Sequence, residues 1–210
     1  MVFNLIICGD RVKEILLELG ICLAAAAFLM IYHECVRLFV YMFCQKSVKC
    51  FRTAPWKVWR YIDPVGLILS LTSMVPISKP YFFRVRDRRT NLCLGMAGIV
   101  SLVVVLAGSV AVLRLGYGGI DGLDHLVLPH WWNAIVPILV QYLALLSAGM
   151  LTANLFPIST FDMGMIVAGV SPAAYLGMIK ADGTVKLIFV LVVLLDMIHY
   201  GASRLIVLFL

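Results

Sequence analysis

The chain has 210 residues, of which 63% are hydrophobic and 13% are charged, and its mean hydropathy is +1.03. Soluble domains are about half apolar and about a quarter charged, so this composition excludes a soluble globular protein. The formal charge of +6 does not indicate a nucleic-acid partner, because ten of the 17 Lys and Arg residues fall in two short stretches between apolar segments, the pattern of cytoplasmic loops in membrane proteins.

Long continuous apolar runs predict an all-α polytopic membrane protein rather than a membrane β-barrel, which would show short alternating segments. The first expected span covers residues 19–44, and a basic stretch with interfacial aromatic residues, 45–61, follows it. The next apolar segment, 64–77, is short, is bracketed by prolines and precedes a second basic stretch, 79–89. Because positive charge flanks it on both sides, we expect a short re-entrant or shallow segment that returns to the cytosolic face. A short true span is the alternative.

The second half of the chain contains the remaining expected spans. They are residues 92–113, 134–156 and 187–210, with a loop of little positive charge at 114–133 and a broken or amphipathic cytosolic segment at 158–184. The prediction is therefore about four transmembrane helices plus one short re-entrant or shallow segment. They form a single integral membrane domain, residues 1–210, that spans the lipid bilayer several times. The N-terminus is expected outside, and the basic loops 45–61 and 79–89 are expected in the cytosol.

The cysteines do not indicate a metal knuckle. They stand at positions 8, 22, 35, 44, 50 and 93, include no C-x-x-C pair, and in several cases lie within apolar runs. We therefore interpret them as small apolar side chains in the membrane rather than as a disulfide framework or a structural zinc site.

Two separated motifs contain the candidate site. The first is His33-Glu34-Cys35-Val36-Arg37 in the first span, and the second runs from Asn154 through Pro157 and Asp162 to Gly164. A zinc-protease helix has the pattern H-E-x-x-H, because residues four apart share one helix face and can hold one metal ion. Here Arg37 stands where the second His would be, and its guanidinium keeps its proton and cannot bind zinc.

In order along the chain, these and three weaker motifs resemble the site-2 protease family of intramembrane zinc metalloproteases. The resemblance is to its short bacterial-type members that lack a PDZ domain, and it covers about residues 31–164 of a site-2-protease-like core. Those members have H-E-x-x-H, I-D-P-x-G, a K-P-V-P-like turn, A-G-P-x-x-N and N-x-x-P-x-P-x-L-D-G. The corresponding residues here are His33-Glu34, Ile62-Asp63-Pro64-Val65-Gly66, Lys79-Pro80, Ala97-Gly98 and Asn154 to Gly164.

The resemblance implies a role for each matching residue. His33 and Asp162 correspond to zinc ligands, Glu34 to the catalytic general base, and Asn154 to a residue that holds substrate or orients the site; Arg37 and Pro157 are expected to line it. Zinc, where present, lowers the pKa of a bound water toward neutrality. The departures from the pattern are Arg37, Ser159 for the second Pro, Met163 for a Gly, and the loss of the Pro and Asn from A-G-P-x-x-N.

Arg37 itself supports a specific hypothesis. It lies one turn from His33, so its guanidinium can occupy the region of the metal and pair with the carboxylates of Glu34 and Asp162. The alternatives are that Arg37 extends to the cytosolic headgroups, and that Glu34 is protonated and bonded to a neighbouring helix. Asp196 and His199, three residues apart, are a further candidate for a replacement ligand or for contacts between helices.

The predicted function is a site-2-protease-like scaffold with an incomplete zinc site, a pseudoenzyme that binds or regulates a membrane-embedded protein or peptide segment without cleaving it and needs no cofactor. One alternative is an active zinc-dependent intramembrane endopeptidase that uses His33, Asp162 and a further ligand. Another is an ion or solute transport component in which Glu34, Arg37, Asp162 and Asp196 line a polar path.

Overall fold

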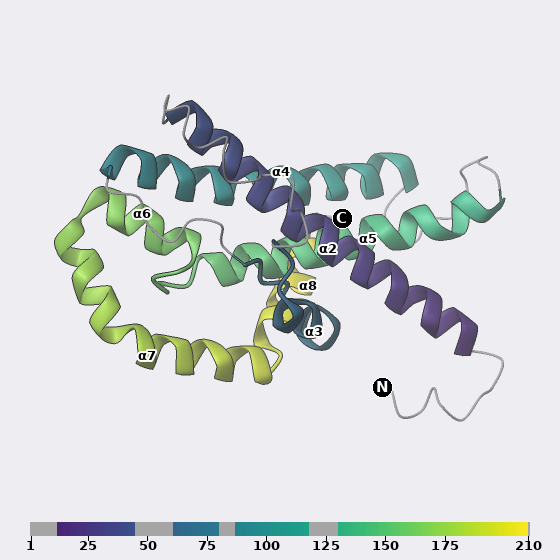
Figure 1. Cartoon of the computed structure of the whole chain (residues 1–210). Coiled ribbons are helices and arrows are strands. Elements are labelled where there is room, and N and C mark those ends of the chain that lie inside the picture. The colour runs from purple at the N-terminus through teal and green to yellow at the C-terminus, as the bar shows by residue number, and fades with distance from the viewer. Residues whose placement is uncertain (1–11, 45–60, 80–86, 118–129, 210) are drawn as a thin grey trace.

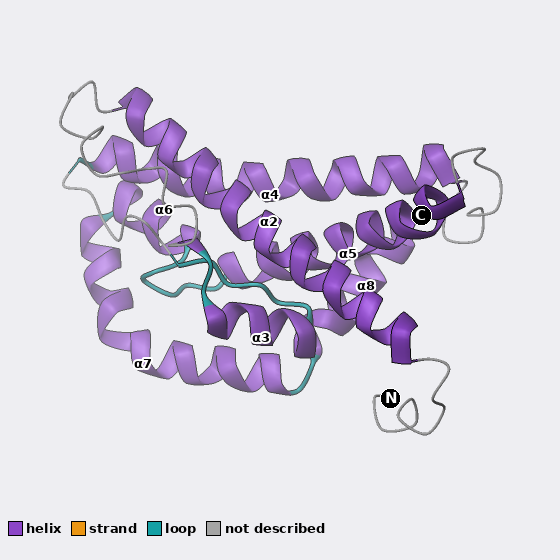
Figure 2. Ribbon diagram, turned by 45° about the vertical axis from the view of Figure 1, so that its right-hand side comes forward, coloured by secondary structure: helices purple, strands orange, loops and turns teal. Residues whose placement is uncertain are grey.

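Seven helices make up the part of the chain that the computed structural model describes, residues 12–44, 61–79, 87–117 and 130–209, and no strand is present there (Figures 1 and 2). They are α2 (Val12–Cys44), α3 (Pro64–Ser73), α4 (Arg88–Tyr117), α5 (His130–Asn154), α6 (Asp162–Val170), α7 (Pro172–Leu194) and α8 (Met197–Phe209). The expected all-α class is thus confirmed for these residues.

Three of the helices are long and apolar enough to cross a membrane, which makes the chain a membrane protein. The candidate spans are Ile15–Cys44 in α2, Arg88–Gly116 in α4 and Ile135–Asn154 in α5. Helices α4 and α5 pack side by side, and α2 crosses both obliquely (Figures 1 and 2). Small residues at the crossing, such as Ala25 and Ala26, are fully buried and let the helices approach closely.

The segment 64–77, which was expected to be re-entrant, lies in a stretch whose two ends are hydrogen-bonded to each other. Asp63 caps α3 by accepting a hydrogen bond from the backbone N–H of Val65 (3.1 Å), and the proline that follows is favoured in the first helical turn. After α3 the chain runs back, and the N–H of Lys79 donates to the carbonyl of Tyr61 (3.1 Å). Residues 61–79 therefore form a closed hairpin rather than a continuous crossing helix.

A glycine makes that hairpin possible. A Cβ on Gly66 would lie 2.1 Å from the carbonyl oxygen of Ile77, so only glycine lets the returning chain pack directly on α3. The D-P-x-G motif thus has a local structural role. The Asp caps α3, the Pro occupies its first turn, and the Gly packs against the returning backbone at Ile77, directly before Ser78.

The expected fourth span, 187–210, is not one helix. Helix α7 ends at Leu194, and α8 begins at Met197 after a turn in which Asp196 adopts a left-handed backbone with φ of 56°. Asp tolerates this conformation better than most residues, so the polar residue inside the apolar run marks a turn. Helix α8 then packs on α5, where Ala202 and Ile206 meet Ala144 and Ala148. The expected break in 158–184 is present, between α6 and α7.

The expected basic loops 45–61 and 79–89 and the loop 114–133 fall largely outside the described residues. Their assignment to the cytosolic or the outer side of the membrane stays a prediction.

Candidate functional site

Four ionisable side chains from the two predicted motifs meet in the interior. Helix α2 contributes His33, Glu34 and Arg37, and Asp162 is the first residue of α6. Each is at most 4% exposed, so the cluster is closed to solvent in this structure. We call these four residues the buried cluster.

Arg37 connects the two carboxylates of the buried cluster. Its Nη1 donates to Oε1 of Glu34 at 2.9 Å, and its Nε lies 3.4 Å from Oδ1 of Asp162. Its remaining contact is weak, from Nη2 to the thioether of Met165 at 3.4 Å. The predicted contact with both acids is therefore present, and the alternative of an arginine extended to the headgroups is wrong, because the side chain is buried.

His33 faces Asp162 on one side and α4 on the other. Its Nε2 lies 3.3 Å from Oδ2 of Asp162, and its Nδ1 lies 3.3 Å from the hydroxyl oxygen of Ser101. Because that hydroxyl donates its own hydrogen to the carbonyl of Gly98 (2.7 Å), the Nδ1 must be the donor in its contact with Ser101. Nε2 is thereby directed at the carboxylate.

The position of Asp162 depends on α4 and α5. The backbone N–H of Asp162 donates to Oδ1 of Asn154 (3.4 Å), while Nδ2 of Asn154 donates to the carbonyl of Met150 within α5. A Cβ on Gly98 would lie 2.2 Å from Oδ2 of Asp162, so the absence of a side chain there creates the space for the carboxylate. Asn154 thus orients Asp162 rather than standing free in a groove.

The α3 hairpin completes the buried cluster. The hydroxyl of Ser78 donates to Oε1 of Glu34 at 2.8 Å, so that oxygen accepts from both Ser78 and Arg37. Glu34 thus contacts Arg37 within α2 and Ser78 in the α3 hairpin, and the alternative of a protonated Glu34 bonded to a neighbouring helix stays a prediction.

The charges of the buried cluster nearly balance without a metal. Two carboxylates and one guanidinium sum to −1 when His33 is neutral, and one proton in the contact between His33 and Asp162 brings the sum to zero. Buried charges are tolerated when they are paired in this way.

These residues form only part of a zinc site. Two ligand atoms about 2.0–2.1 Å from a tetrahedral zinc lie about 3.3 Å apart, and Nε2 of His33 and Oδ2 of Asp162 have that separation. However, no group of three or more His, Cys, Asp or Glu residues that could hold a metal occurs among the described residues. The guanidinium of Arg37, between Glu34 and Asp162, belongs to the residue that stands where the H-E-x-x-H pattern has its second His.

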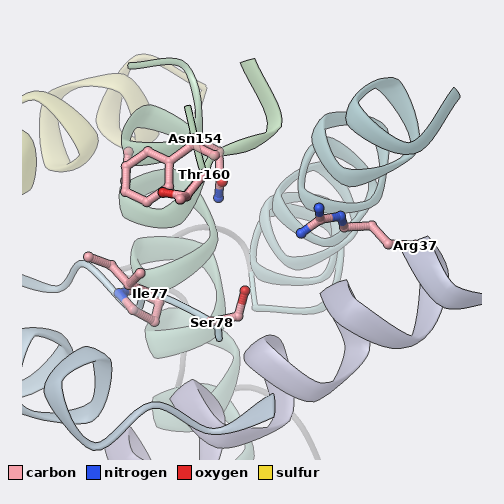
Figure 3. A pocket seen from close by; sticks show the side chains of 8 residues that line it. Arg37, Ile77, Ser78, Asn154 and Thr160 are labelled. Atoms are coloured by element: carbon pink, nitrogen blue, oxygen red, sulfur yellow. The ribbon is translucent and has the colours of Figure 1, made fainter. Parts of the chain in front are cut away.

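A small pocket lies beside Arg37, between the chain at 76–78 and the turn at 160–161, with Asn154 at its wall (Figure 3). Its volume is about 10 Å³, which is space for roughly one water molecule. Pro157 is exposed in the α5–α6 turn and does not line this pocket. Asp196 and His199 contact each other at 3.1 Å on the exposed corner between α7 and α8, apart from the buried cluster.

Sequence reasoning missed Ser78, Ser101 and Met165. Their only signal was position: Ser78 directly precedes the Lys79-Pro80 motif, and Ser101 lies one turn after Gly98. Serine is too common in membrane helices for that position alone to identify a contact with His33 or Glu34.

No protein-family model, no curated protein and no solved structure matches the chain in the three comparisons made.

Proposed function

We propose that the chain is a site-2-protease-like membrane protein in which the guanidinium of Arg37 stands in for the metal, and that it binds or regulates a membrane-embedded protein or peptide segment without cleaving it. The observation that carries this proposal is the placement of Arg37 between Glu34 and Asp162, at 2.9 Å and 3.4 Å. In that position the cation holds the first span to the α5–α6 turn, as a shared metal would.

Electrostatics oppose zinc beside this arginine. Two unit charges 4 Å apart repel by about 4 kcal/mol at the effective dielectric constant of about 20 that suits protein sites, so a dication is opposed by about 8 kcal/mol. Structural zinc binding contributes roughly 10–16 kcal/mol with a full set of ligands. With only His33 and Asp162 to bind it, zinc would lose most of that affinity.

The size of the pocket supports a role without proteolysis. The pocket beside Arg37, about 10 Å³, admits a water molecule but no peptide strand, and Glu34 itself is only 1% exposed. A membrane partner would bind on the outer faces of the helices, where many apolar side chains are exposed.

The test is the metal content of purified wild type beside the Arg37→His variant. We expect metal-free wild type and about one zinc per chain in Arg37→His, because the substitution both supplies a third ligand and removes the opposing cation. The matched control is Arg37→His with Asp162→Asn, which should lose the zinc again. Stoichiometric zinc in the wild type would overturn the proposal.

An active zinc protease is the second candidate. It is favoured by the 3.3 Å distance between Nε2 of His33 and Oδ2 of Asp162, which is the distance between two ligand atoms of a tetrahedral zinc. It requires zinc in the wild type and peptide cleavage that is lost on chelation and in Glu34→Gln. A binding protein instead keeps its membrane partner when a chelator is added.

A further inference from the structure

Helix α7 is joined to the rest of the molecule by few contacts. Of its 23 residues only Tyr175, Phe189 and Val193 are buried, and its main helix contacts are with α6 and α8, its neighbours along the chain. Figures 1 and 2 show it at the edge of the molecule. A turn bounds it at each end, with extended backbone at Ser171 before the helix and a φ of 56° at Asp196 after it. Turns at both ends are positions about which a helix can swing as a rigid body.

Helix α7 nevertheless holds the turn between α5 and α6 at two points. One carboxylate oxygen of Asp182 accepts a hydrogen bond from the backbone N–H of Ser159 (2.9 Å), and Lys186 pairs with the other oxygen. We call the bond between Ser159 and Asp182 the latch. Two turns further along α7, the ring of Phe189 packs edge-on against the ring of Phe161, with 5.4 Å between the ring centroids.

The turn that α7 holds is one wall of the pocket beside Arg37. Thr160 and Phe161, which directly follow Ser159, line this pocket on one side, and the α3 hairpin lines it on the other (Figure 3). The next residue of the turn, Asp162, belongs to the buried cluster. Moving α7 away from the turn would therefore release a wall of the only space found beside Arg37 among the described residues.

The latch depends on a position at which the second motif changes. Ser159 stands where the N-x-x-P-x-P pattern has its second Pro. Because a proline has no backbone N–H, the latch could not form with that residue in place. The acceptor is a carboxylate, so the bond is charge-assisted and stronger than one between neutral groups.

We propose that α7 is a strap whose latch keeps the pocket beside Arg37 closed, and that release of the latch opens the buried cluster to solvent and to dissolved molecules. This inference goes beyond the proposed function, because the strap controls access to the buried cluster whatever ion the cluster holds. The metal content of the protein and the opening of the strap are separate measurements, so failure of either proposal leaves the other standing.

The experiment measures how fast a cysteine in the pocket is alkylated. Ala153 lines the pocket from α5 and is 2% exposed, so Ala153→Cys supplies a thiol that N-ethylmaleimide reaches when the wall moves. The full-length protein in detergent is treated with this reagent for increasing times, and mass spectrometry of its peptides gives the rate at position 153. Cys22, which is buried against α3, is the internal reference, because global unfolding would expose it too.

Ser159→Pro is compared with Ser159→Ala, because both lack the hydroxyl and only the alanine keeps the backbone N–H. We expect alkylation at position 153 to be about tenfold faster in Ser159→Pro, which corresponds to about 1.4 kcal/mol in the opening equilibrium. The rate at Cys22 should be the same in both. In an Asp182→Ala background, which removes the acceptor, the two variants should react at equal rates at position 153 as well.

Hydrogen exchange of the segment 155–165 provides a second readout that needs no added cysteine. It should be faster in Ser159→Pro than in Ser159→Ala, and this difference should also vanish in the Asp182→Ala background. Equal rates for the two variants while Asp182 is present, or a difference that persists without Asp182, would overturn the proposal.

Discussion

Replacing Arg37 with methionine tests the buried cluster directly. Methionine keeps much of the side-chain length but removes the cation, which leaves Glu34 and Asp162 buried at no more than 1% exposure without their shared partner. Removing one partner of a buried ion pair costs about 3–5 kcal/mol, because the remaining charge is uncompensated. One kcal/mol shifts the melting temperature of a chain of this size by about 2–4 °C, so we expect a decrease of about 6–20 °C.

The assay is thermal unfolding in detergent, with Arg88→Met as the matched control. Arg88 is exposed and donates to the carbonyls of Gly169 and Val170, so losing it removes a surface contact and leaves no buried charge. That control should lose at most about 1 kcal/mol. A double variant, Arg37→Met with Glu34→Gln, should lose less than the sum of its single variants by more than about 0.5 kcal/mol. Equal melting temperatures for wild type and Arg37→Met would refute the existence of the buried cluster.

Two further predictions follow from the packing around Asp162 and from α7. Gly98→Ala should destabilise by about 1–3 kcal/mol, because its Cβ would lie 2.2 Å from the carboxylate of Asp162, whereas Gly108→Ala in the same helix has open space and should be neutral or slightly stabilising in the same melting assay. Burial raises the pKa of Asp182, but hydrogen bonds from Lys186 and from the backbone of the α5–α6 turn outweigh this and hold the pKa below its ordinary value. Asp182 therefore stabilises the fold above its unfolded pKa of about 3.9. This contribution is lost as the pH falls through the pKa of Asp182 in the folded protein. Asp182→Asn should therefore melt at a lower temperature than the wild type at pH 6, and the two melting temperatures should become equal in strong acid.

The elements that could be predicted from the sequence are those with local causes. The three long apolar runs are helices because their hydropathy extends over enough residues, and α3 starts at Asp63-Pro64 because an N-cap and a first-turn proline act within a few residues. Within the described residues, helix α2 extends to Val12, beyond the expected span 19–44.

The turn at Asp196 could not be predicted, because the run from 187 to 210 is apolar enough for a span and has no Gly or Pro at the turn. The position of α8 is instead determined by its packing against α5, which leaves Ala202 only 4% exposed. A single residue in the left-handed conformation then suffices to change the direction of the chain between α7 and α8.

The candidate site was predictable in its charged members and not in its neutral ones. An ionisable side chain within an apolar run needs a partner of opposite charge. The apolar runs contain few such side chains, so a contact of Arg37 with Glu34 and Asp162 could be inferred. Ser78 and Ser101 contact the cluster from 44 and 68 residues away in sequence, and nothing local distinguishes them from other serines.

The proposed replacement of a metal by Arg37 is consistent in both charge and shape. Zinc would supply two positive charges to the carboxylates of Glu34 and Asp162, and the guanidinium of Arg37 supplies one of these in a planar form that reaches both acids. One proton shared between Nε2 of His33 and Oδ2 of Asp162, which lie 3.3 Å apart, would supply the second charge. The two arrangements are then equivalent in net charge, so the proposed replacement leaves both acids compensated. They differ in chemistry, because a guanidinium neither binds a water molecule nor lowers its pKa. It follows that Arg37→His without zinc lacks one positive charge, and its melting temperature should depend on added zinc while that of the wild type should not.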